Sequence, residues 1–223
     1  DVVLLGWSFP TAAFAAATRL KLIAFMGIGV GTYVDLDAAV RSGVTVCNTP
    51  GYADDAVAEH ALALLLALAR RITPTHEALR RGRWAPRMGT TLRGKCLGIV
   101  GFGGIGRRMA ELGNALGMDV IAWTPHASRY DAPTYCRFRT FEEVLAHADA
   151  LSLHIAESEQ THHLIDAAAL ARMKRSCLLI NTARGAIIDE EALIAALDKG
   201  ALGGAALDVF CLLYTSDAAD DCE

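Results

Sequence analysis

The chain has 223 residues, a formal net charge of −4 and 53% hydrophobic residues, enough for two domains or one large one with an apolar core. The negative charge argues against nucleic acid as a partner, because phosphate binding needs clustered Lys and Arg, and the longest apolar run, residues 61–69, is too short to cross a membrane. The six cysteines have no CxxC or other metal-ligand spacing, so we expect no metal site and a reducing, cytoplasmic setting.

The first α/β unit is predicted before Thr90. Two strand-like runs, residues 20–25 and 44–47, flank a glycine-rich stretch and a helix-like segment over residues 35–41. A long helix is then predicted from about residue 54 to residue 72, with Asp54 or Asp55 placed to cap its start.

From Leu92 onward, predicted strands and helices alternate strictly. The strands are residues 96–100, 120–123, 150–155, 177–182 and 205–209, and the helices are residues 105–116, 141–146, 167–173 and 190–199. This alternation predicts a parallel sheet with helices on both faces, in which ligands bind at the carboxyl ends of the strands.

Residues 92–106 are predicted to form a strand, a glycine turn and the start of a helix. Gly101 allows the tight turn, Gly103 lets backbone N–H groups approach phosphates, and Gly106 lets the helix pack on the sheet. The helix N-terminus adds free N–H donors and partial positive charge. A GxGxxG match alone is weak, but the strand before it and the amphipathic helix after it favour a dinucleotide pyrophosphate site.

Three further groups follow the later strands: His154, residues 181–185 and Asp208. All three are expected to face the same crevice as the glycine turn. An Arg on a Gly-containing turn, such as Arg184, suits a bidentate contact to a carboxylate. The alternatives are a surface or helix-capping Arg184, a capping Asp208 and a hydrogen-bonded core histidine at 154.

Several separated motifs, taken in order, resemble the D-isomer-specific 2-hydroxyacid dehydrogenase family over residues 27–210. They are Gly29-Val30-Gly31 with Val34-Asp35, Asn48-Thr49-Pro50-Gly51, Val57-Ala58-Glu59-His60-Ala61, residues 92–106, Leu153-His154, residues 181–185 and Ala206-Leu207-Asp208-Val209-Phe210. The implied fold class is α/β, with a Rossmann-type doubly wound parallel sheet in residues 91–210. Residues 1–90 would hold the connecting helix and a second, smaller and incomplete flavodoxin-like substrate domain. A homodimer is also implied.

The resemblance implies hydride exchange between a nicotinamide cofactor and C2 of a small 2-hydroxy or 2-keto acid. Arg184 would bind the substrate carboxylate or ketone oxygen, and backbone N–H groups of Val30 and Gly31 would help hold the carboxylate. The implied cofactor-binding residues are Gly101, Gly103, Gly104, Ile105, Gly106, Thr124, His154, Thr182, Ala183 and Asp208. A cation and oriented N–H groups can polarise a carbonyl as it gains negative charge, which agrees with these roles.

The chain departs from the expected pattern at the cofactor ribose. An acid is expected about 20 residues after the glycine turn, at the end of the second strand, but Thr124 stands there. Without a carboxylate to reject a 2′-phosphate, the cofactor is expected to be NAD or NADP, with NADP tolerated or preferred. Thr124, Ser128 or Arg129 would lie near the phosphate, unless Arg129 is only a loop charge.

The second departure concerns the proton donor. The family's chemistry uses a His and an orienting Glu after the Asp208 motif, but no His follows His163, and the expected place of the Glu is Leu213. Because losing a general acid/base costs about 10²- to 10⁴-fold, the chain as given is expected to be inactive. Residues 211–223 resemble a translated sequencing adapter and are interpreted as a non-native tail of a fragment missing both ends.

Two alternatives stay open. A cofactor-sensing binding protein, such as a transcriptional corepressor of this fold, would need a charged partner-binding surface, which the sequence does not show. A related enzyme such as a formate dehydrogenase would need other pocket residues near residues 27–31, which are also not seen.

Overall fold

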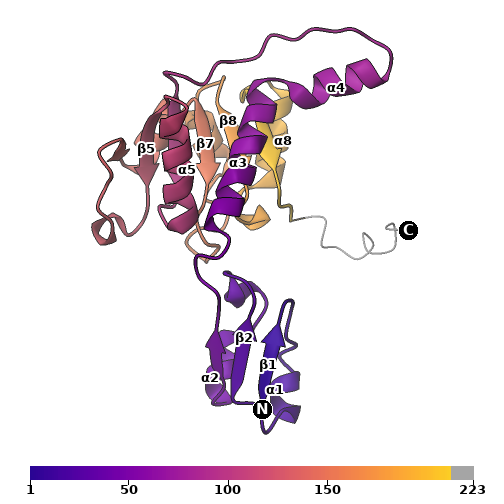
Figure 1. The fold of residues 1–223 in the computed structure, drawn as a ribbon, viewed down its shortest axis with the longest axis vertical. Helices are drawn as coiled ribbons and strands as arrows, with labels where there is room; N and C mark the ends of the chain where they lie inside the picture. The colour runs from indigo at the N-terminus through magenta and orange to yellow at the C-terminus, as the bar shows by residue number, and fades with distance from the viewer. Residues whose placement is uncertain (212–223) are drawn as a thin grey trace. The chain divides into compact units, whose positions relative to one another are not determined.

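The computed structural model describes residues 1–211, which divide into two compact units after Ala53 (Figure 1). The first unit holds a parallel sheet in the order β1-β2-β3. Its elements are β1 (Val2–Leu5), α1 (Ala13–Ala16), β2 (Leu22–Phe25), η1 (Val30–Thr32), α2 (Leu36–Arg41) and β3 (Thr45–Cys47). Asp35 caps α2, where its carboxylate accepts the N–H of Ala38 at 2.8 Å. The predicted strands and helix are present, and β1 and α1 are additional because four-residue runs have too little periodicity to be predicted.

The second unit holds six parallel strands in the order β6-β5-β4-β7-β8-β9. The strands are β4 (Cys96–Val100), β5 (Asp119–Trp123), β6 (Cys136–Phe138), β7 (Ala150–Leu153), β8 (Leu178–Asn181) and β9 (Gly204–Leu207). This is the strand order of a doubly wound Rossmann sheet, and the order reverses at β4. The glycine turn after β4 therefore stands at the switch point, where ligands bind in such sheets.

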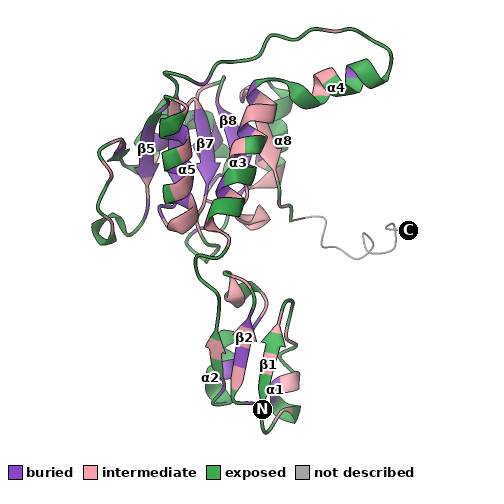
Figure 2. Ribbon diagram, viewed as in Figure 1, coloured by how far each residue is buried: buried purple, intermediate pink, exposed green. Residues whose placement is uncertain are grey.

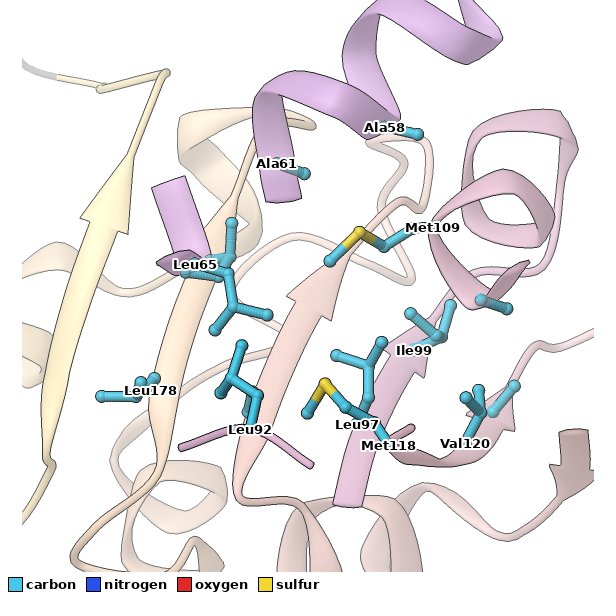
Figure 3. Close-up of a cluster of buried hydrophobic side chains, with 14 of the residues drawn as sticks. Ala58, Ala61, Leu65, Leu92, Leu97, Ile99, Met109, Met118, Val120 and Leu178 are labelled. Atoms are coloured by element: carbon cyan, nitrogen blue, oxygen red, sulfur yellow. The ribbon is translucent and has the colours of Figure 1, made fainter. Parts of the chain in front are cut away.

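Helices cover both faces of this sheet, as predicted. One core lies beneath α3 (Asp54–Ala69) and α5 (Gly104–Ala115), where Leu65 and Met109 meet Leu97 and Ile99 of β4 (Figure 3). The other core lies beneath α6 (Phe141–His147), α7 (Ala167–Arg172) and α8 (Glu190–Asp198). The strands β4, β7 and β8 between the two layers are almost wholly buried (Figure 2). A sheet buried on both faces gives the turns at its strand ends a rigid base.

Two predictions about helices are wrong in detail. The helix predicted over residues 54–72 ends at Ala69, because Arg71 adopts a left-handed conformation (φ 56°), and α4 (Ile72–Arg80) begins after it. Asp54 and Asp55 lie in the first turn of α3 instead of preceding it.

The predicted strict alternation of strands and helices is also wrong at one place, since only the short η2 (Ala127–Arg129) separates β5 from β6. None of the helices in residues 1–211 is long and apolar enough to cross a bilayer.

Candidate functional site

The turn after β4 requires glycine at two positions for reasons of space. Gly101 has φ +94°, and a Cβ there would lie 2.6 Å from the carbonyl carbon of His154. A Cβ on Gly106 would overlap the carbonyl oxygen of Gly101 and lie 3.3 Å from Cγ2 of Ile99. Gly101 therefore lets the turn pass close to the backbone that follows β7, and Gly106 lets α5 approach the turn and β4 closely.

Gly103 differs, because a Cβ at this position would meet nothing within 4 Å. Gly103 is the N-cap of α5, and no side chain of residues 1–211 caps this helix. Gly104, Ile105 and Gly106 thus begin a helix whose first N–H groups are left without a capping acceptor. Protein packing does not explain the missing side chain at Gly103, whereas an approaching phosphate does. The turn therefore fits the pyrophosphate of a dinucleotide.

The end of β5 borders a pocket of about 730 Å³. Its lining residues are Trp123, Thr124, Ala127, Phe138, Arg139, Thr140, Phe141, Glu142 and Glu143. Thr124 is buried at 8% exposure. The cation Arg139 lines the pocket, whereas Ser128 and Arg129, the other residues expected near a phosphate, lie in η2 and are not among the lining residues. Arg139 was not anticipated from the sequence because β6, the strand before it, was not predicted.

His154 follows β7 and is tied to its own strand. Its Nε2 lies 2.8 Å from Oγ of Ser152, and its backbone N–H donates to the carbonyl of Val100 at 2.7 Å. Burial lowers the pKa of His154 to about 4, so the ring is neutral near pH 7. These contacts favour the alternative of a hydrogen-bonded, partly buried histidine.

The turn after β8 is held by the side chain of Asn181, which is 1% exposed. Its Nδ2 donates to the carbonyl of Arg184 at 2.8 Å, and its Oδ1 accepts the N–H of Ala183 at 3.0 Å. Arg184 donates from Nη1 to the carbonyl of Ala183 at 2.6 Å and has no ion-pair partner within residues 1–211. The hydroxyl of Thr182 on the same turn is buried without a hydrogen-bond partner among the described residues. The turn therefore presents an unpaired cation and an unsatisfied hydroxyl.

Asp208, just past β9, lies against α3. Its Oδ1 is 3.2 Å from Nε2 of His60, and both side chains are about half exposed. This pairing differs from the alternative of Asp208 as a helix cap. His60 occurs in the sequence motif over residues 57–61, but no local pattern links it to Asp208.

The predicted substrate residues Val30 and Gly31 lie in η1 of the first unit. The loop before η1 is tied to the turn after β3, since Nδ2 of Asn48 donates to the carbonyl of Ile28 at 2.8 Å and the N–H of Thr49 donates to that of Gly27 at 3.0 Å. Leu213 and the remainder of the interpreted tail beyond Cys211 lie outside the described residues.

The family model described as "D-isomer specific 2-hydroxyacid dehydrogenase, NAD binding domain" matches residues 62–212. The chain belongs to this family. The sheet order, the glycine turn and the strand-end turns described above therefore make up the NAD-binding domain of a D-isomer specific 2-hydroxyacid dehydrogenase.

Several known proteins are similar to most of the chain. A glyoxylate reductase from Aeropyrum pernix is 41% identical over 204 residues, covering 87% of this chain and 61% of the relative. A solved acyclic imino acid reductase in complex with NADPH and D-Arg superimposes with a TM-score of 0.85 at 31% identity, covering 94% of this chain and 68% of that one. A solved D-lactate dehydrogenase from Aquifex aeolicus, complexed with NAD and lactic acid, superimposes with a TM-score of 0.84 at 30% identity. The match covers 94% of this chain and 63% of that one. The chain thus spans less than two thirds of the Aeropyrum relative.

Proposed function

We propose that the protein to which this chain belongs is an NAD(P)-dependent 2-hydroxyacid dehydrogenase acting on a small 2-hydroxy or 2-keto acid. The observation that carries the proposal is that two turns lie at the same edge of one sheet: the turn after β4, where the space around Gly103 is open, and the turn after β8, where Asn181 holds the backbone of Arg184. The first suits a dinucleotide and the second suits a carboxylate.

The dinucleotide supplies or accepts the hydride when it is bound. On this proposal, the N–H groups of Gly103, Gly104 and Ile105 hold its pyrophosphate at the N-terminus of α5, while Gly101 and Gly106 keep the backbone close enough for them to do so. The residues proposed to line the nicotinamide are Thr182, Ala183 and Asp208. The buried, unpartnered hydroxyl of Thr182 supports this assignment, because such a group requires a partner.

We assign the substrate contact to Arg184. A guanidinium presents a planar fork that matches a carboxylate, and next to a ketone it stabilises the negative charge that develops on oxygen. The Asn181 side chain bonds to the carbonyl of Arg184 and to the N–H of Ala183, so the backbone that carries the guanidinium is held in place. Backbone N–H groups of Val30 and Gly31 are proposed to help hold the substrate carboxylate. On this proposal residues 1–90 have the substrate role and residues 91–210 the cofactor role.

Both NAD and NADP are proposed as cofactors. Thr124 provides no negative charge against a 2′-phosphate, and Arg139 brings a cation to the adjoining pocket. Glu142 and Glu143 line the same pocket, so their carboxylates limit how strongly NADP is favoured.

A homodimer in the cytoplasm is also proposed. Trp84 and Met88, which follow α4 in a segment without helix or strand, are 82% and 95% exposed, and Ile72 and Leu79 on α4 are exposed as well. Large apolar side chains gathered on one segment are typical of an association surface. The location is proposed because the cysteines have no paired spacing in the sequence, which favours a reducing compartment.

The test measures binding before turnover. Calorimetric titration with NADH and NADPH is expected to show one site, and oxamate, an unreactive 2-keto acid analogue, is expected to bind to the NADH complex. Arg184→Gln is expected to keep NADH binding and lose oxamate binding. The control Arg175→Gln, whose guanidinium donates to the carbonyl of Gly200, is expected to keep both. Reduction of glyoxylate or hydroxypyruvate by the complete protein then defines the substrate. A chain that binds neither dinucleotide contradicts the proposal.

A further inference from the structure

Gly104 is a glycine that the dinucleotide fingerprint does not require. The pattern G-x-G-x-x-G is satisfied by Gly101, Gly103 and Gly106, and position 104 is one of its variable places. The backbone of Gly104 is ordinary helix, so no special φ demands a glycine either. The reason must lie in what surrounds this position.

The neighbour at Gly104 is a carboxylate. A Cβ on Gly104 would lie 2.5 Å from Cγ and 2.8 Å from Oδ1 of Asp54, and would overlap Oδ2. The Asp54 side chain thus occupies the space of a residue 104 side chain. Glycine at 104 and the acid at 54 form a matched pair, contributed by the first residues of α5 and α3.

Among residues 1–211, no side chain neutralises the charge of Asp54. The adjacent Asp55 is neutralised by Arg108, whose Nε lies 2.6 Å from Asp55 Oδ1, and Arg108 also binds Glu111 at 2.7 Å. Asp54 takes part in no ion pair within residues 1–211. Its carboxylate instead faces the N-terminal turn of α5, where the helix dipole and free N–H groups attract an anion.

We propose that Asp54 is a built-in competitor for the dinucleotide pyrophosphate, an inference that rests on the proposed function. In the free protein its carboxylate supplies negative charge at the start of α5. When the dinucleotide binds, the pyrophosphate meets this charge at close range, so Asp54 weakens binding and hastens release. Gly104 makes room for the competing carboxylate.

The test compares Asp54→Asn with Asp55→Asn by titrating each chain with NADH. Asp54→Asn keeps the shape and removes the charge, and is expected to bind NADH about three- to tenfold more tightly at low salt. This advantage is expected to shrink at high salt, since exposed charges are screened. Asp55→Asn breaks the ion pair with Arg108 but is not expected to tighten binding.

A second readout does not depend on cofactor. Without ligand, Asp54→Asn is expected to lower the Tm, because α5 loses the anion at its start. Gly104→Ala is expected to lower the Tm in the parent chain and to have a smaller effect together with Asp54→Ala, which removes the overlapping carboxylate.

Equal or weaker NADH binding by Asp54→Asn overturns the inference while leaving the proposed function intact. So does a tightening of the same size in Asp55→Asn, which would make the effect one of net charge alone. Absence of binding in every chain overturns the proposed function and this inference with it.

Discussion

Nε2 of His60 lies 3.2 Å from Oδ1 of Asp208, which joins helix α3 to the end of strand β9. The two residues are 148 positions apart in the chain and share no local pattern. Because both side chains are about half exposed, the pair contributes little to stability, of the order of 0–1 kcal/mol. Its consequence is the direction in which the Asp208 carboxylate points.

Removal of this partner should affect cofactor binding more than folding. His60→Ala is expected to weaken NADH binding about threefold, while Tm changes by only about 1–2 °C. His60→Gln, whose amide can donate to the same oxygen, should retain most of the affinity. Titration calorimetry and thermal unfolding on the three chains measure both effects. If His60→Ala binds NADH like the parent, the orientation of Asp208 does not depend on His60.

Two glycines of the same turn should respond differently to alanine. Gly101→Ala introduces a Cβ at φ +94° against the backbone of His154 and Ile155, and is expected to destabilise the fold by about 2 kcal/mol or more. Gly103→Ala meets nothing within 4 Å, so Tm should be preserved while NADH affinity falls. Denaturant unfolding and NADH titration of both variants provide the comparison. Equal stability losses would show that Gly103 is also a packing residue.

The free energy of unfolding should decrease as the pH is lowered, because of His154. Burial lowers its pKa to about 4 from the ordinary 6.5, so below pH 6.5 the unfolded chain binds a proton that the folded chain does not. The contribution is complete above pH 6.5 and is lost as pH falls from 6.5 towards 4, by about 2–3 kcal/mol. Denaturant unfolding of the parent and His154→Asn across this range measures the difference, and parallel pH profiles for the two chains would refute it.

An acid at the end of β5 should separate the two cofactors. Thr124→Asp places a carboxylate where a ribose-binding acid is expected and where a 2′-phosphate would lie. NADPH binding is expected to weaken about tenfold or more, with NADH binding unchanged or improved. The matched control is Thr140→Ala on the same pocket, which removes the cap of α6 at a cost of about 1 kcal/mol without adding charge. Parallel loss of both dinucleotides in Thr124→Asp would show only local damage.

Much of the cofactor domain can be predicted from the sequence. The glycine turn is predicted by the spacing of Gly101, Gly103 and Gly106. Two central strands are predicted by the apolar runs at 96–100 and 150–155, because buried parallel strands are short and continuously apolar. By contrast, β6 was not predicted, since its three residues Cys136–Phe138 include the charged Arg137 and follow β5 without a helix. The end of α3 before Arg71 was also not predicted, because a run of helix-forming residues gives no sequence signal for a left-handed residue.

The sequence by itself determined the fold class and the type of ligand, because glycine spacing and strand–helix alternation are local properties that can be recognised without knowing how the elements pack. Only the tertiary structure decided which side chains meet at the site. Asp54 against Gly104, Asp208 against His60 and Arg139 at the pocket beside Thr124 all join separate elements. Such contacts depend on how helices dock on the sheet, and that docking is set by the shape of the whole core.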